Sequence, residues 1–531
     1  MIAMSKFVAL LRLNLKSMIS SYRLGGRKRT RAASGIGALV LMAGLACYLS
    51  ATYSFLFAHQ LSGVGMLPIL MLLMPAMAMF MGFFFTVFAA QGVIFGGKDN
   101  DLMLALPVSP FLLMLTRTLA LYLENLIFSL FIMLPAGAAY LFFGGAGGVW
   151  FTAALLLGTI FLALLPTLLS LACGFALAWF SSKFTRRAWV STLLYFIFFG
   201  LLMAGVLRIN TGMMELAGAA DTIQEGFAVW GLPFLLLQQA ACYGSPLSLI
   251  GFLAICLLPF LGVVWLFARQ YKRIVTNLSA KGARSDYRLE KLSASAQWRS
   301  LLKKEADRYF GTPIYIFNTG FGLVLMLIAS VAALVLRRQL VVLVTALGGL
   351  PVMPILAAGL MLLVSTVAVT GSSISLEGKY LWILKEAPIS PVTLFVVKTG
   401  FQLLLCLPCL LFASVCLGLA FSVPFTQVAL LVLTVGIYAV LSALLGLYLN
   451  LCYPKLDAPN DAVVVKQSAA AMLSTFGAML IAAAGIGVYI LIWRKLGAIG
   501  AVGLCAVFFA AVSAALAGLL WTKGQRMFRE L

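Results

Sequence analysis

The side chains that could do chemistry in this sequence are few and widely separated. The segment from Gly92 through Gly97 to Lys98 approaches the G-x-x-x-x-G-K-[ST] phosphate-binding loop. Asp99 stands where that loop needs a hydroxyl to bind magnesium, and an acid at this position repels phosphate. The segment also follows a long apolar run, whereas a phosphate-binding loop follows a strand. We therefore expect no ATP or magnesium site, and no other cofactor, in this chain.

Cysteine and histidine do not show the spacing of a metal or redox site. Cys406 and Cys409 form a C-x-x-C motif, but no histidine lies nearby and the surrounding residues are apolar. His59 is the only histidine in the chain. No metal site is expected, and we find no paired acids and no nucleophile with its base. A membrane enzyme is therefore the least favoured class of function.

Glu124 and Asn125 are the clearest polar pair inside a long apolar run. A charge near the centre of a bilayer costs about 2.5–3.5 kcal/mol, so such a residue usually faces protein or water. Glu124 and Asn125 are therefore candidate pathway residues. A protonated Glu124 that hydrogen-bonds within the helix bundle is an equally weighted alternative.

The elements that carry these residues are predicted to be membrane helices. Of the 531 residues, 63% are hydrophobic and only 10% are charged, whereas about a quarter are charged in a typical soluble protein. We expect an all-α polytopic membrane protein of about twelve transmembrane helices, because about 20 apolar residues cross a bilayer. The predicted spans are 36–58, 67–94, 117–142, 150–180, 189–207, 249–268, 316–336, 352–374, 395–418, 427–451, 470–493 and 498–521.

The distribution of basic residues predicts the orientation. There are 37 Lys and Arg against 15 Asp and Glu. With the N-terminus in the cytoplasm, all but Arg208, Arg337, Arg338, Arg494 and Lys495 lie on the inner side, which satisfies the positive-inside rule. Both termini are therefore expected in the cytoplasm. The basic residues occur in short stretches between apolar runs, which favours contact with lipid headgroups and argues against nucleic-acid binding.

Five segments follow from this topology: a basic N-terminal segment (1–35), a first six-helix half (36–268), a cytoplasmic linker (269–315), a second six-helix half (316–521) and a cytoplasmic tail (522–531). Residues 4–20 predict a helix on the inner leaflet, with a solvated leader as the alternative. Residues 297–305 predict a second surface helix at the end of the linker. The apolar stretch 231–237 is too short to span, and either a re-entrant hairpin or a packed loop suits it.

An internal repeat without gaps appears at an offset of 281 residues. Seven identities fall in the 22 positions from Gly97 to Thr118, and Pro107-Val108-Ser109-Pro110 recurs as Pro388-Ile389-Ser390-Pro391. Each copy lies on the inner side, after the second span of its half. The two halves are therefore expected to be parallel six-helix repeats with a pathway between them.

Each copy predicts a short amphipathic helix that stops at a proline, followed by a serine that caps the next membrane helix. A turn with no further role is the simpler alternative for a single copy, but duplication at equivalent loops favours a functional role. We expect the two loops to receive force from a soluble partner. The first candidate coupling loop contains Gly97, Lys98, Asp99, Asp101, Pro107, Ser109 and Pro110. The second contains Glu377, Gly378, Lys379, Lys385, Glu386, Pro388, Ser390 and Pro391.

Three groups of residues resemble the type 2 ABC-exporter permeases of bacteria, in a double-length branch with twelve spans. They are Glu377-Gly378-Lys379-Tyr380-Leu381-Trp382-Ile383-Leu384-Lys385 with Pro388-Ile389-Ser390-Pro391; Leu449-Asn450-Leu451-Cys452-Tyr453-Pro454-Lys455-Leu456-Asp457 with Val465-Lys466-Gln467; and Leu302-Lys303-Lys304-Glu305 before Pro313-Ile314-Tyr315. The similarity covers both halves in layout, but its specific motifs amount to about 60 residues. The first loop departs from the pattern, with Asp99-Asn100-Asp101 in place of Tyr380-Leu381-Trp382.

This resemblance implies a permease subunit in the bacterial plasma membrane that moves a substrate outward. It implies that the loop after the second span docks on a separate cytoplasmic ATPase, in two copies, which carries the ATP and magnesium. Membrane lipid is the other expected partner. An ion-coupled secondary transporter is the alternative, which would need intramembrane acids or broken helices. Neither the resemblance nor the residues identify the substrate.

Overall fold

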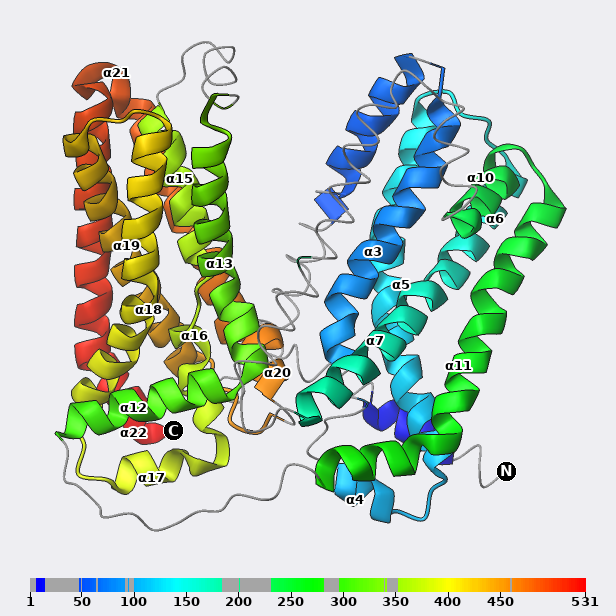
Figure 1. Cartoon of the computed structure of the whole chain (residues 1–531), viewed down its shortest axis with the longest axis horizontal. Helices are drawn as coiled ribbons and strands as arrows, with labels where there is room; N and C mark the ends of the chain where they lie inside the picture. The colour runs from blue at the N-terminus through cyan, green and yellow to red at the C-terminus, as the bar shows by residue number, and fades with distance from the viewer. Residues whose placement is uncertain are drawn as a thin grey trace. The chain divides into compact units, whose positions relative to one another are not determined.

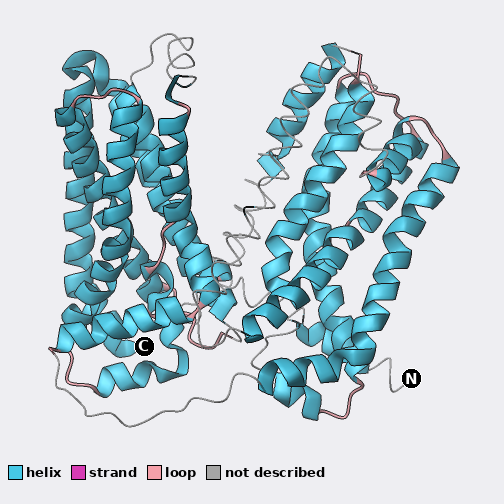
Figure 2. Ribbon diagram, viewed as in Figure 1, coloured by secondary structure: helices cyan, strands magenta, loops and turns pink. Residues whose placement is uncertain are grey.

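We describe the protein from a computed structural model. The structure describes residues 6–14, 47–48, 50–63, 65–90, 94, 100–183, 200, 231–280, 296–338, 340, 352–458 and 461–531. Within these ranges every regular element is a helix and no strand occurs (Figure 2). The all-α prediction is confirmed for this part of the chain.

Nine helices in the described part of the chain are long and apolar enough to cross a membrane. They coincide with ten predicted spans, because the helical run Val463–Glu530 covers the eleventh and the twelfth. The predicted span 189–207 lies outside the described residues, except for residue 200, and 36–58 is described only from residue 47. A multi-pass membrane protein is thus confirmed, while the total of twelve spans and the parallel repeat of whole halves stay predictions.

The described residues fall into two compact units, one ending at residue 280 and the other beginning at residue 296. In unit 1 (Figure 1), a helix over 6–14 and a helical segment over 50–63 precede the remaining elements. These are η1 (Leu67–Ile69), α3 (Leu70–Ala90), α4 (Asn100–Ala105), α5 (Pro110–Phe142), α6 (Val149–Leu162), α7 (Leu164–Lys183), α10 (Leu232–Cys242) and α11 (Pro246–Ala280).

Unit 2 contains two groups of elements. The membrane helices are α13 (Pro313–Val335), α15 (Val352–Ser365), α16 (Thr370–Ser373), α18 (Pro391–Ala420), α19 (Phe425–Cys452) and α21 (Ala469–Leu519). The other elements are α12 (Gln297–Gly311), η4 (Ser375–Tyr380), α17 (Leu381–Glu386), α20 (Asp461–Gln467), η5 (Leu520–Gly524) and α22 (Gln525–Glu530). Figure 1 shows α12, α17 and α22 at one end of the unit and the turn within α21 at the other.

The two predicted spans in α21 are joined by a reversal at Gly497. The φ angle of Gly497 is 70°, a left-handed value that glycine adopts with little strain. The two arms then pack closely: the Cys505 thiol lies 3.2 Å from the carbonyl oxygen of Gly485. A Cβ atom on Gly485 would overlap the ring of Phe509. Small residues in the eleventh span therefore permit close helix packing.

The structure also describes parts of the predicted linker and all of the predicted tail. Helix α11 continues to Ala280, and α12 packs on unit 2 through Leu301. The described parts of the predicted linker, 269–280 and 296–315, are therefore almost entirely helix, and each belongs to one unit. The predicted tail 522–531 is helical as far as Glu530. It packs on unit 2, since Phe528 is 4% exposed and its ring lies 6.0 Å from that of Phe395.

The second span of unit 2 is broken. Helix α15 ends at Ser365 and α16 begins at Thr370, so residues 366–369 are not helical. Side chains satisfy the freed backbone groups: the Tyr315 hydroxyl donates to the Val369 carbonyl at 2.8 Å, and the Gln402 side chain accepts from the Thr370 amide at 2.9 Å. Irregular backbone at membrane depth is tolerated where protein surrounds it in this way.

Candidate functional site

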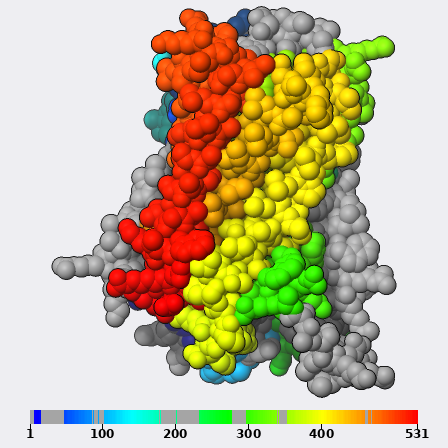
Figure 3. Space-filling view, turned by 90° about the vertical axis from the view of Figure 1, so that its left-hand side faces the viewer, coloured from blue at the N-terminus to red at the C-terminus, as the bar shows by residue number. Residues whose placement is uncertain are grey.

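The second predicted coupling loop forms an elbow between membrane helices in unit 2. Its elements are η4, α17 and the start of α18, and helix α12 lies across them. Figure 3 shows α12 in green and the yellow elbow gathered at one end of this unit. We call η4, α17 and residues 387–391 the second elbow.

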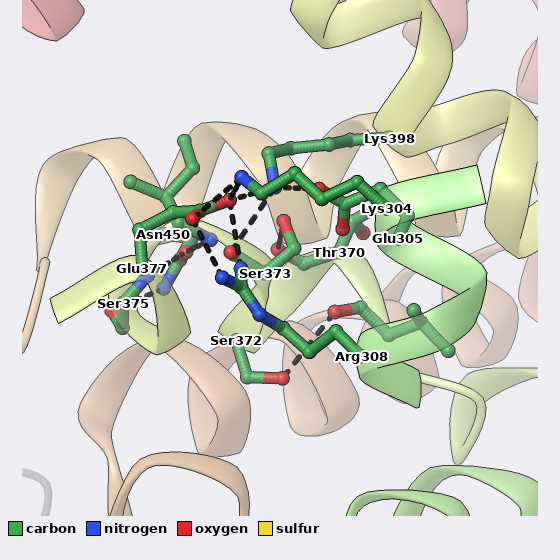
Figure 4. Close-up of polar contacts among 12 residues, drawn as sticks. Lys304, Glu305, Arg308, Thr370, Ser372, Ser373, Ser375, Glu377, Lys398 and Asn450 are labelled. Carbon is green, nitrogen blue, oxygen red and sulfur yellow. Dashed lines mark hydrogen bonds and ion pairs between the residues drawn. The ribbon is translucent and has the colours of Figure 1, made fainter. Parts of the chain in front are cut away.

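Buried ions hold this elbow to α12 and α18. Glu377 is 2% exposed, and its carboxylate binds Lys304 at 2.8 Å, Arg308 at 2.7 Å and Lys398 at 3.2 Å. Lys398 also binds Glu305 at 2.6 Å and donates to the Ser373 carbonyl at 3.2 Å. Figure 4 shows Lys304, Arg308 and Lys398 converging on Glu377.

We call these five residues (Lys304, Glu305, Arg308, Glu377 and Lys398) the ion cluster. Three cations and two carboxylates share it, so neither carboxylate is left without a charge partner. Burial lowers the pKa of Lys304, and attraction by Glu377 opposes that shift. Removing one member of a buried ion pair costs about 3–5 kcal/mol, because the remaining charge stays in a dry environment. The ion cluster therefore holds α12, the elbow and α18 to one another.

Asn450, at the end of α19, fixes the backbone where the chain enters the elbow. Its side-chain oxygen accepts from the amides of Ile374 and Ser375 at 2.8 and 3.1 Å, and its nitrogen donates to the Ser375 hydroxyl at 2.8 Å. That hydroxyl also accepts from the Lys455 amide at 2.9 Å. Burial lowers the pKa of the Lys455 side chain to about 8. The elbow is thus attached to α19 as well as to α18.

Gly378 turns the chain from η4 towards α17. Its φ and ψ are 54° and −132°, a combination that only glycine adopts without strain. Helix α17 buries Leu381 and Leu384 and leaves Trp382 and Ile383 exposed by 60% and 49%, and Tyr380, just before it, is exposed by 70%. The elbow therefore has an anchored inner side and an apolar, aromatic outer side.

The two predicted loops have matching local structure. Helices α4 and α17 cover the same positions at the offset of 281 residues. Ser109 accepts from the amide of Leu112 at 3.3 Å, and Ser390 accepts from that of Thr393 at 3.1 Å. Each serine is followed by a proline at the first position of a long helix. We call α4 and residues 106–110 the first elbow.

Each elbow is also held by an amphipathic helix through the carbonyl of its first proline. Lys6 donates to Pro107 at 2.9 Å, and Gln297 donates to Pro388 at 2.8 Å. Four residues further on, Leu10 and Leu301 are both buried against their own unit. The helix predicted at 4–20, which the structure describes over 6–14, therefore has the same local role as α12. The internal repeat in the sequence did not reveal this similarity.

The described partners of the buried cations differ between the two units. Arg117 corresponds to Lys398 at the repeat offset and is 4% exposed. It donates to the Tyr271 hydroxyl at 2.9 Å, and Tyr271 donates to the Ile94 carbonyl at 2.9 Å. On the outer side of the first elbow, Leu102 and Leu106 are exposed by 69% and 41%. The two elbows therefore differ in chemistry while they share their backbone arrangement.

The remaining predicted residues are placed as follows. Gly97, Lys98 and Asp99 lie outside the described residues, and Asp101 lies in α4. Pro107, Ser109, Lys379, Glu386, Pro388 and Ser390 are exposed, whereas Pro110, Lys385 and Pro391 are partly buried. Glu377 points inward, to the ion cluster, and fixes the backbone of the elbow. The outer side of the elbow is formed by α17.

Asn125, one of the two predicted pathway residues, lies at a polar junction in unit 1. Its side-chain nitrogen donates to Thr86 at 3.2 Å and to Thr167 at 3.0 Å, which ties α5 to α3 and α7. Asn125 is fully buried, whereas the adjacent Glu124 is partly exposed. Asn125 therefore connects three helices of unit 1, and a pathway role for Glu124 and Asn125 stays a prediction.

Sequence reasoning missed several members of the site. It gave Lys398 no role, and it quoted Lys304, Glu305 and Asn450 only as parts of the resemblance. Arg308 was not singled out at all. The sequence did contain one signal for the ion cluster. Lys398 lies seven residues after Pro391 in an apolar run, and a cation in such a run needs a buried acceptor.

Within the described residues, no three His, Cys, Asp or Glu side chains come together in an arrangement that could hold a metal ion. Comparison with protein-family models, with curated proteins and with solved structures gives no match for this chain.

Proposed function

We propose that this chain is the membrane subunit of an ATP-driven exporter, and that a separate cytoplasmic ATPase docks on the two elbows. In this proposal both elbows and both termini face the cytoplasm of a bacterial cell. Two ATPase subunits bind, one at each elbow, and they carry the nucleotide and magnesium. Their closure moves the membrane helices of the two units.

The observation that carries the proposal is the attachment of the second elbow. The ion cluster binds it to α12 and α18, and Asn450 binds it to α19. Because the links to α18 and α19 are buried, a force on α17 is passed to two membrane helices with little loss in a flexible loop. A surface turn with no mechanical role would not require a buried charge network of this cost.

The outer side of the elbow supports the docking role. Tyr380, Trp382 and Ile383 form an exposed apolar surface beside the basic Lys379. Aromatic residues are the commonest residues to contribute most of the binding energy in protein interfaces. The first elbow presents Leu102 and Leu106 instead, which predicts a weaker or different contact.

The test is co-purification from the native membrane, followed by measurement of ATP hydrolysis in the complex. Substitution of Pro107, Lys385 or Glu386 should leave the chain folded and change the hydrolysis rate that the membrane subunit imposes on its ATPase. Trp382→Ala should weaken ATPase binding by about tenfold or more. Phe425→Ala is the matched control, since Phe425 is 85% exposed at the opposite end of unit 2. Equal loss of binding in both variants would contradict docking at the elbow.

The broken span at 366–369 favours a second candidate, an ion-coupled secondary transporter. Discontinuous membrane helices provide ion-binding backbone groups in such proteins. Here the side chains of Tyr315 and Gln402 already form hydrogen bonds with backbone groups at the break. We therefore place this candidate second. Transport that survives ATP depletion and is abolished by collapse of the proton gradient would favour it over the exporter.

A further inference from the structure

A pocket lies in unit 1 at the turn between α10 and α11, at the end of the unit away from α4 (Figure 1). Its volume is about 360 Å³. Gly244, with a φ of 68°, makes the turn that brings the two helices together. The lining residues are Leu235, Gln238, Gln239, Tyr243, Ser245 and Ser248. None of the described side chains that line it carries a charge.

The polar groups of the turn are arranged around one another. The Ser248 hydroxyl lies 3.0 Å from the side-chain oxygen of Gln239 and 3.0 Å from the Ser245 hydroxyl. The Ser248 amide donates to Ser245 at 3.3 Å. Each hydroxyl can donate one hydrogen bond and accept two. The rim of the pocket therefore retains hydrogen-bonding capacity beyond these internal contacts.

Gln238, in contrast, lacks such hydrogen bonds among the described residues. It is 1% exposed, and neither its side-chain nitrogen nor its oxygen has a hydrogen-bond partner in the described part of the chain. Buried polar groups are nearly always paired, because an unpaired amide in a dry site is costly. An amide at the wall of a pocket can recover that cost when a bound molecule supplies both a donor and an acceptor.

We propose that this pocket binds an uncharged polyhydroxylated group, such as the sugar of a glycolipid or a free sugar, through Gln238. A charged ligand is disfavoured, because no described lining side chain offers a counter-charge and desolvation would not be offset. Paired hydroxyls each donate and accept, so they match the adjacent N–H and C=O groups of one amide.

The surroundings favour a lipid as the source of this group. Leu247, between two lining serines, is 80% exposed, and Val149 is 89% exposed. Trp150, next to Val149, donates to the Ala240 carbonyl of α10 at 2.9 Å. Apolar side chains therefore flank the polar pocket, as an acyl chain attached to a sugar would require. This proposal is independent of the ATPase assignment.

The experiment uses the full chain in phosphatidylcholine nanodiscs, with monoglucosyl diacylglycerol as the lipid probe, free glucose as the soluble probe and phosphatidic acid as the charged probe. Native mass spectrometry gives the affinity, and hydrogen exchange reports protection over 231–248. We expect the glycolipid to bind and protect the turn, and phosphatidic acid to do neither. Protection by free glucose at comparable affinity would support the site and identify a soluble ligand.

Gln238→Leu should weaken glycolipid binding by about tenfold or more. Gln270→Leu is the matched control, because Gln270 is an exposed amide on α11 away from the pocket. If Gln238→Leu does not fold, Ser248→Ala tests the same pocket and should also weaken binding. The proposal would be overturned if the pocket variant that folds bound the glycolipid with wild-type affinity. It would also be overturned if neither sugar probe bound to the native protein.

Discussion

The ion cluster allows a quantitative prediction for Lys398→Met. The Lys398 side chain is fully buried, and it provides the only cation within 4 Å of Glu305 among the described residues. Methionine fills a similar volume but leaves the Glu305 carboxylate, which is 5% exposed, without that partner. Glu377 keeps Lys304 and Arg308. We therefore expect the free energy of unfolding to fall by about 3–5 kcal/mol.

A second substitution separates lost attraction from lost packing. Glu305→Gln in the Lys398→Met background removes the stranded charge, so it should recover a large part of the lost free energy. The coupling energy between the two positions should be about 1–3 kcal/mol. Lys523→Met provides the control, because Lys523 is an exposed lysine in the same unit.

Equilibrium unfolding in mixed detergent micelles can be followed with a dye that reacts with thiols. Cys406, Cys416 and Cys505 are buried in unit 2 and become reactive when it unfolds. A loss of less than about 1 kcal/mol in the free energy of unfolding of Lys398→Met would refute the role of the ion cluster. A double variant that loses the sum of the two single losses would refute it as well.

Three further predictions follow from the second elbow. Trp382→Ala should reduce ATPase co-purification without changing the unfolding midpoint, whereas Trp298→Ala on α12 should leave ATPase binding unchanged. Gly378→Ala should destabilise the protein by about 1–3 kcal/mol because its φ is 54°, whereas Gly400→Ala, in open space within α18, should be neutral or stabilising. Lys455 releases its proton near pH 8 when folded and near pH 10.4 when unfolded, so the unfolded state binds more protons between these values and stability rises with pH there. Lys455→Gln should remove that part of the pH dependence of the unfolding midpoint, and an unchanged profile would contradict the shift.

The sequence predicted the parts of the fold that depend on local pattern. Apolar length located ten spans that the structure describes as membrane-length helices. Pro-x-Ser-Pro predicted both serine caps, because a serine before a proline fixes the start of a helix through adjacent atoms. The sequence also predicted a short helix before Pro107 and another before Pro388, and the structure has Asn100–Ala105 and Leu381–Glu386 there.

The remaining features depend on contacts between distant residues. Glu377 meets Lys304 across 73 positions, and no local pattern records which buried cation pairs with which acid. The interruption at 366–369 was missed because Val367, Ala368 and Val369 are apolar and continue the hydropathy of a span. Its partners, Tyr315 and Gln402, come from other helices. The packing of Phe528 was missed because a short basic terminus has the composition of a free tail.

The most direct test of docking at the second elbow is site-specific crosslinking in intact cells. A photoreactive amino acid replaces Trp382 on the second elbow or, as the control, Phe425 at the opposite end of unit 2. We predict that the probe at position 382 crosslinks a soluble cytoplasmic protein that binds ATP, and that the probe at position 425 does not. Crosslinking of position 382 only to proteins or reagents outside the cell would contradict this prediction, because the elbow could then receive no force from a cytoplasmic ATPase.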